Sequence, residues 1–151
     1  HVETAKEMLA ACEKALPVDI AVCAAAVADF GVKKAAQKIK KQHGKKTLAL
    51  LENPDILAQL GAHKKRPKLL IGFAAETENL LKNASAKRKK KGCDWIVAND
   101  VSGGKIFGEG ENKVTLLTKN GNENWPKMNK ENVAEKLVER IILSFSRKRE
   151  S

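Results

Sequence analysis

Three short apolar runs alternate with segments of helical pattern, and this alternation constrains the fold more than any other feature. The runs cover residues 19–26, 68–73 and 94–98. Each is almost wholly apolar, which is typical of strands buried on both faces of a sheet. Because strands that alternate with helices form mainly parallel sheets covered on both faces, the sequence predicts an α/β fold with three layers, α/β/α.

Local signals place two helices in the first half of the chain. Thr4 and Glu7 have the S/T-x-x-E spacing of a capping box, and the apolar residues that follow have helical spacing up to Pro17. A second helix is expected at 53–60. Asn53 is a favourable N-cap for it, and proline is common at the first helical position, where Pro54 stands.

Two more helices are expected in the second half. One runs from about Glu76 to Lys91 and ends at Gly92, in the position that glycine favours after a helix. The other begins at about Lys130. Its apolar stripe is formed by Val133, Leu137, Val138, Ile141 and Ile142.

The remaining segments are expected to be edges and loops. Residues 47–51 form a short strand candidate, and 113–119 predict an antiparallel edge strand that turns at Asn120-Gly121. Residues 31–46 are polar and rich in lysine, which favours a loop or flap. Since there is no internal repeat and no low-complexity linker, a single domain over 1–151 is expected.

Composition excludes several classes of protein. The chain has 151 residues, of which 42% are hydrophobic, so a globular domain is expected rather than a disordered one. No apolar stretch approaches the roughly 20 residues that span a bilayer. Cys12, Cys23 and Cys93 are far apart and the three histidines lack metal-ligand spacing. The sequence therefore predicts reduced thiols in a cytoplasmic protein, without a metal cluster, a Ser–His–Asp triad or a Cys–His pair.

The formal net charge of +11 favours anionic ligands without saying which, so nucleic acid, an acidic membrane or a small polyphosphate remain open. Lysine is dense at 38–41 and at 87–91. On a helix, Lys87 and Lys91 share a face and could clamp one polyphosphate. The alternative is a solvated basic face, which is the commoner origin of such a run.

Polar residues follow each predicted strand, where ligands bind in open parallel sheets. Asp29 follows the first run, and the start of the helix at 53 exposes free N–H groups that suit a phosphate. Glu76 with Thr77, and Asn99 with Asp100, follow the later strands. The alternatives are polar loops and ordinary helix capping. The small residues at 24–26 suit either a planar ligand or tight packing.

Five motifs occur in order along the chain: AAAVADF at 24–30, KIKK at 38–41, NPDIL at 53–57, GFAAET at 72–77 and VANDV at 97–101. This series resembles the phosphopantothenate–cysteine ligase domain of bacterial bifunctional coenzyme A biosynthesis proteins. The likeness covers essentially the whole chain, and five ordered motifs are far more specific than any one alone.

The resemblance implies a fold similar to Rossmann and ribokinase-like sandwiches, and a dimer. It implies a ligase that joins L-cysteine to 4'-phosphopantothenate through an acyl-cytidylate, with CTP as substrate and Mg²⁺ as cofactor. FMN belongs to a decarboxylase domain that such proteins usually carry upstream and that this sequence lacks. The glycine-rich first strand and the Asn-x-Ser-Ser-Gly motif of the family are also missing, so the chain is expected to be a C-terminal portion of the ligase domain whose activity alone is in doubt.

The resemblance also assigns site residues. Lys38 corresponds to the family's catalytic lysine, whose ammonium would stabilise the charge that builds up in the reaction. Metal ligands are not assigned, and Cys23 is expected to act through its backbone. Phe73 suits either a nucleotide contact or the core. The nucleotide-binding positions are Cys23, Ala24, Ala25, Asp29, Lys38, Pro54, Asp55, Ile56, Leu57, Phe73, Lys87 and Lys91.

Two other functions compete with the ligase. A basic nucleic-acid-binding module fits the charge, but aromatic residues make up only 4% and tyrosine is absent, whereas such modules commonly pair basic patches with aromatics. A non-catalytic fragment for nucleotide binding or dimerisation is the other alternative. The expected partners are therefore the three small substrates and a second copy of the chain, without nucleic acid or membrane.

Overall fold

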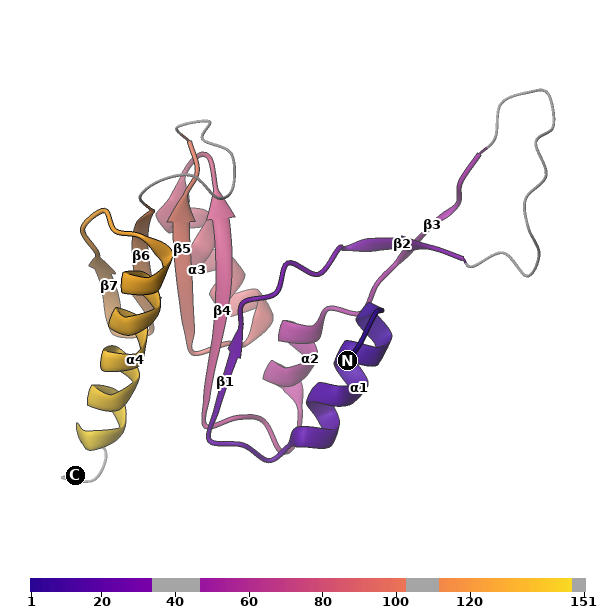
Figure 1. Cartoon of the computed structure of the whole chain (residues 1–151), viewed down its shortest axis with the longest axis horizontal. Helices are drawn as coiled ribbons and strands as arrows, with labels where there is room; N and C mark the ends of the chain where they lie inside the picture. The colour runs from indigo at the N-terminus through magenta and orange to yellow at the C-terminus, as the bar shows by residue number, and fades with distance from the viewer. Residues whose placement is uncertain (34–46, 103–111, 148–151) are drawn as a thin grey trace.

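A five-stranded mixed sheet forms the centre of the molecule (Figure 1). The computed structural model describes residues 1–33, 47–102 and 112–147. Strands β1, β4 and β5 are parallel, whereas β6 and β7 form an antiparallel hairpin beside β5. The order across the sheet is β1 (Ile20–Cys23), β4 (Leu69–Glu76), β5 (Trp95–Asp100), β6 (Lys113–Thr118) and β7 (Gly121–Asn124).

Helices cover both faces of this sheet, which confirms the predicted three-layer α/β/α fold. Side chains of α1 (Ala5–Ala15), α2 (Ile56–Ala62) and α3 (Leu80–Lys91) pack on one face. Helix α4 (Lys130–Arg147) packs on the other face (Figure 1).

The central strands are apolar throughout because both of their faces are buried. Leu70 and Ile96 are fully buried in the layer of α1 to α3, and Ile71 is fully buried in the layer of α4. Successive residues of a strand point to opposite faces, so a strand between two helix layers needs apolar residues at every position.

Strand β1 differs from this prediction. It is an edge strand in the described part of the chain, with β4 as its neighbour, and Ile20 and Val22 are 38% and 46% exposed. The prediction that the 19–26 run is buried on both faces is therefore wrong. The run is apolar, but in the described structure no helix lies over the face that carries these two side chains.

A second, two-stranded antiparallel sheet forms an arm that extends away from the main sheet (Figure 1). It consists of β2 (Phe30–Val32) and β3 (Leu50–Glu52), paired with Phe30 opposite Glu52. The predicted strand at 47–51 is found as β3, slightly later in the chain, while β2 lies partly in the segment predicted as a loop. Residues 34–46, which include the lysine cluster at 38–41, and residues 103–111 lie outside the described residues.

The first helix begins as predicted and the second does not. At α1, the Thr4 hydroxyl accepts a hydrogen bond from the Glu7 amide at 3.2 Å, and the Glu7 carboxylate accepts one from the Thr4 amide at 2.9 Å. At α2 the N-cap is Asp55, whose carboxylate accepts from the Ala58 amide at 3.1 Å. The prediction of Asn53 as this cap is wrong, because the chain before Pro54 forms part of the arm instead.

Three features of the second half of the chain were predicted only in part. Helix α3 begins at Leu80 rather than near Glu76, because β4 continues to Glu76 in register with β5. The predicted antiparallel strand and turn are found as the β6–β7 hairpin at the edge of the sheet, with β7 rather than β6 as its outermost strand. In α4, Val138 and Ile142 are 54% and 59% exposed, so the apolar stripe is only partly buried.

Candidate functional site

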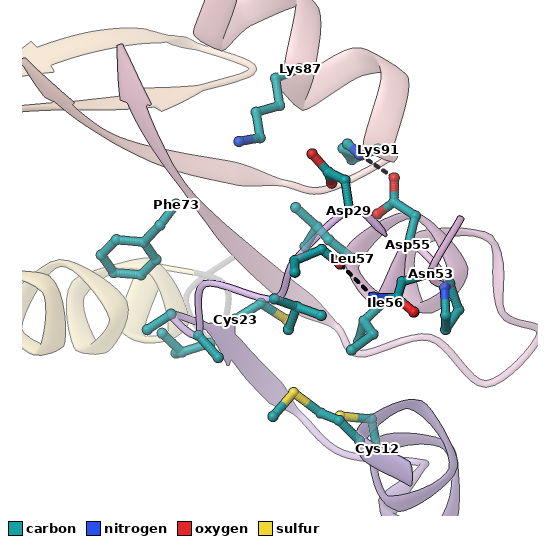
Figure 2. Close-up of a pocket in the computed structure, with 17 residues that line it drawn as sticks. Cys12, Cys23, Asp29, Asn53, Asp55, Ile56, Leu57, Phe73, Lys87 and Lys91 are labelled. Atoms are coloured by element: carbon teal, nitrogen blue, oxygen red, sulfur yellow. Dashed lines mark hydrogen bonds and ion pairs between the residues drawn. The ribbon is translucent and has the colours of Figure 1, made fainter. Parts of the chain in front are cut away.

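A pocket of about 270 Å³ lies beyond the carboxyl end of β1, between the 24–29 segment, the start of α2, β4 and α3 (Figure 2). It gathers residues from five separate parts of the chain, including α1. Every predicted nucleotide-binding position except Lys38, which lies outside the described residues, lines this pocket: Cys23, Ala24, Ala25, Asp29, Pro54, Asp55, Ile56, Leu57, Phe73, Lys87 and Lys91.

The wall formed by residues 24–29 connects β1 to the arm and is irregular in structure. Two hydrogen bonds join it to the segment between β3 and α2, and Asn53 donates both. The Asn53 side-chain amide donates to the Ala28 carbonyl at 2.9 Å, and its backbone amide donates to the Asp29 carbonyl at 2.8 Å (Figure 2). Asp29 is therefore placed by β2–β3 pairing and by Asn53, rather than by the main sheet.

One end of the pocket holds an ion pair between Asp55, at the start of α2, and Lys91, at the end of α3 (Figure 2). The Lys91 side chain is 21% exposed and the Asp55 side chain 41%. Burial alone would raise the pKa of Asp55. The hydrogen bonds from Lys91 and Ala58 and the charges of Lys91 and Lys90 outweigh burial, so the pKa lies below its usual range.

Lys87 lies one helical turn before Lys91 and lines the same pocket. Across the described ranges, no carboxylate forms an ion pair with it. The two lysines thus share one face of α3, as predicted, but they differ in state. Lys91 is neutralised by Asp55, whereas Lys87 presents its charge to the pocket.

The position of Lys91 depends on a close crossing of α2 and α3. A Cβ atom added to Gly61 of α2 would overlap the Lys91 carbonyl oxygen and lie 3.1 Å from the Gly92 carbonyl oxygen. Gly92 itself has φ 63°, the left-handed conformation that glycine adopts most readily, as predicted for the end of this helix. Glycine at position 61 therefore allows the end of α3 to lie against α2, where Lys91 reaches Asp55.

Not all of the predicted strand-end residues reach the pocket. Glu76 and Asp100 are paired in register at the ends of β4 and β5, but neither lines it. Asp100 accepts hydrogen bonds from the Ser102 hydroxyl and amide and from Lys113, and the Ser102 bonds are the main reason that its pKa is lowered. Among the described residues, no group of three His, Cys, Asp or Glu side chains has the arrangement of a metal site.

Other lining residues were missed because nothing in the sequence separates them from core. Met8 and Cys12 belong to the apolar stripe of α1, yet both line the pocket. Phe73, for which the sequence left a nucleotide contact or a core role open, lines the pocket and also packs against the core layer of α4. Burial raises the pKa of the Cys23 thiol to about 11, so it stays protonated at neutral pH and is a poor nucleophile.

Comparison with known proteins places the chain in a family. Residues 1–144 match the family model described as "DNA/pantothenate metabolism flavoprotein C-terminal domain". The chain belongs to this family. Its described part contains no helix that is long and apolar enough to cross a membrane.

Relatives agree with this assignment. The chain is 40% identical over 149 residues to the coenzyme A biosynthesis bifunctional protein CoaBC of Haemophilus influenzae, covering 97% of the chain and 37% of that protein. It is 43% identical over 126 residues to CoaBC of Bacillus subtilis, covering 82% of the chain and 31% of that protein. The crystal structure of a CoaBC C-terminal domain superposes with a TM-score of 0.75 at 33% identity, over 96% of the chain and 64% of that domain. The chain thus spans less than half of these curated relatives.

Proposed function

We propose that this chain is the CTP-binding part of a phosphopantothenate–cysteine ligase of coenzyme A biosynthesis. In this reaction the carboxylate of 4'-phosphopantothenate takes the cytidylyl group of CTP to give an acyl-cytidylate and pyrophosphate, and the amine of L-cysteine then displaces CMP. The observation that carries the proposal is the pocket. It brings together all the described positions that the family resemblance assigns to nucleotide binding, and one of them, Lys87, has no ion-pair partner among the described residues. The similarity to CoaBC proteins supports the same pathway.

The pocket has the chemistry that a nucleoside triphosphate needs. Lys87 offers a positive charge to the phosphates, and Lys91 adds a second ammonium that Asp55 holds in place. In the 24–29 wall, residues 24 and 25 have small side chains, which leave room for a flat base close to the backbone. Phe73 and Leu57 supply apolar surface that excludes water from one side of a ligand.

Magnesium fits this pocket as an ion carried by the nucleotide. Mg²⁺ keeps several waters and is commonly held by one or two carboxylates together with substrate phosphates. The Asp29 carboxylate lines the pocket and would supply such a contact, whereas Asp55 is occupied by Lys91. When bound, the ion would neutralise phosphate charge. The role of Lys38 as the catalytic lysine stays a prediction from the family resemblance.

Binding of CTP to the chain itself is the direct test. In the presence of magnesium, CTP at a concentration of a hundred times its Kd should stabilise the fold by about 2.7 kcal/mol, so the melting temperature should rise. ATP and GTP should have smaller effects. Lys87→Ala should weaken CTP binding by roughly 1.5 kcal/mol, about tenfold, because one charged hydrogen bond is lost. Lys82→Ala, an exposed position on the same helix that does not line the pocket, is the matched control.

The outcomes separate the alternatives. Equal stabilisation by CTP of the wild-type chain and of the Lys87→Ala variant would remove Lys87 from the site. Stabilisation by duplex DNA but not by CTP would favour the nucleic-acid-binding module. No shift with any nucleotide would favour a scaffold or dimerisation fragment.

We also propose that the arm mediates a homodimer. It exposes five large apolar side chains on or next to its two paired strands, and patches of this kind usually mark contact surfaces. They are Phe30, Val32, Leu48, Leu50 and Leu51, each more than half exposed.

Sedimentation analysis checks this proposal. The wild-type chain should sediment as a dimer, and Leu50→Ser should shift it toward monomer because a polar group would be buried without a partner. Leu81→Ser changes a leucine of α3 that is 46% exposed and serves as the control, which should stay dimeric. A monomeric wild-type chain would contradict the proposal.

A further inference from the structure

The side chain of Asn53 is engaged across the pocket rather than at the helix start that follows it. An asparagine directly before a proline at the start of a helix is normally explained as the N-cap of that helix. Here the cap is Asp55, whose carboxylate accepts from the Ala58 amide. The Asn53 amide instead donates to the Ala28 carbonyl, 25 residues earlier in the chain. The side-chain contact of Asn53 therefore belongs to the wall of the pocket and not to the helix cap.

The backbone around Asn53 makes this contact possible. A residue before proline is restricted to extended conformations, so Asn53 continues the direction of β3. Its backbone amide consequently extends the β2–β3 pairing by one step, to the Asp29 carbonyl. The side chain then lies over Gly31, where an added Cβ would be only 3.1 Å from the Asn53 Oδ1 atom. Glycine at position 31 leaves the space that the amide occupies.

The two hydrogen bonds act on the wall that carries predicted ligand contacts. The segment 24–29 includes Ala24, Ala25 and Asp29, which line the pocket, and it has no regular secondary structure. Without the Asn53 side chain, one of its two connections to the start of α2 is lost. The other side of the pocket, formed by the start of α2 and the end of α3, is held independently because Asp55 pairs with Lys91. The distance between the 24–29 wall and this side thus depends on the contacts of Asn53.

We propose that Asn53 is a positioning residue, which holds the 24–29 wall against the start of α2 and so fixes Asp29 opposite the lysines of α3 (Figure 2). The identity of the ligand rests on the proposed function, whereas the effect on the wall does not. Asn53 acts through the wall and not through the reacting atoms.

Hydrogen exchange and CTP affinity, measured on the same variants of the whole chain, test this role. Asn53→Leu keeps the shape of the side chain and its neutrality but removes the donor. In the nucleotide-free chain, the backbone amide of residue 53, which donates to the Asp29 carbonyl, should exchange roughly threefold to tenfold faster relative to its intrinsic rate, the factor expected for loss of the neighbouring side-chain hydrogen bond. The dissociation constant of CTP should rise by a similar factor. Asn122→Leu, at an exposed position of the opposite edge strand β7, should change neither.

Each outcome decides one point. Unchanged exchange of the residue 53 amide, or faster exchange spread evenly over the whole chain, would overturn the assignment. Faster exchange of this amide with unchanged CTP affinity would also overturn it, since the contact would then serve only the fold. If the wild-type chain shows no response to CTP, the proposed function fails, and the exchange comparison still decides whether Asn53 holds the wall.

Discussion

Replacement of Gly61 by alanine is expected to lower the free energy of unfolding by about 3 kcal/mol, although alanine is the better helix former. In an exposed helix this change would stabilise by up to about 1 kcal/mol. At Gly61 the new Cβ would overlap the Lys91 carbonyl oxygen, which belongs to the backbone and cannot rotate away. The end of α3 must then move, and the steric cost exceeds the gain in helix propensity.

Urea unfolding of the variant measures this cost. Gln59→Ala, at an exposed position of the same helix, provides the control and should change stability by less than about 0.5 kcal/mol. Because the displaced residue is Lys91, the Gly61 variant should also lose CTP affinity at temperatures where it remains folded. A stability equal to or above that of the wild type would show that α2 and α3 do not cross as closely as described.

Lys91→Ala is expected to weaken CTP binding by roughly 3 kcal/mol, about a hundredfold, and so by clearly more than Lys87→Ala. Each substitution removes one cation from the pocket. Loss of Lys91 also leaves the Asp55 carboxylate without its partner, and an unpaired anion at this end repels the phosphates. Lys87 has no such partner among the described residues, so its removal costs only the direct contact.

A double-mutant cycle separates the two contributions. Asp55→Asn together with Lys91→Ala should regain part of the lost affinity, because the repelling charge is gone while the amide keeps an oxygen that can cap α2. Isothermal titration with CTP and magnesium gives the four affinities. If the double variant binds no better than Lys91→Ala alone, Asp55 does not act through its charge.

The pH of this experiment follows from the pKa of Asp55. Its folded-state pKa is lowered, so the pair's stabilisation is present above the unfolded pKa of aspartate and is lost as the pH falls through the lower folded value. At neutral pH the carboxylate of the wild-type chain is therefore ionised and paired with Lys91, and the affinities are compared at that pH.

Much of the architecture was predictable because its signals lie within a few residues of one another. The Thr4–Glu7 capping box, the apolar runs that became β4 and β5, and Gly92 at the end of α3 were confirmed. The prediction was wrong where burial depends on a neighbouring element. The apolar residues Ile20 and Ile142 are exposed, since periodicity records which residues are apolar and not what covers them.

The sequence by itself determined the alternation of strands and helices, the capping box of α1 and the five ordered motifs that indicated the family. Only the tertiary structure decided that Asp55 binds Lys91, that Asn53 binds Ala28, and that Lys87 is left with an unpaired charge among the described residues. The physical reason is distance along the chain. The contacts of Asn53 with Ala28 and of Asp55 with Lys91 join residues 25 and 36 positions apart, and their partners are chosen by how closely helices cross and where glycine leaves room.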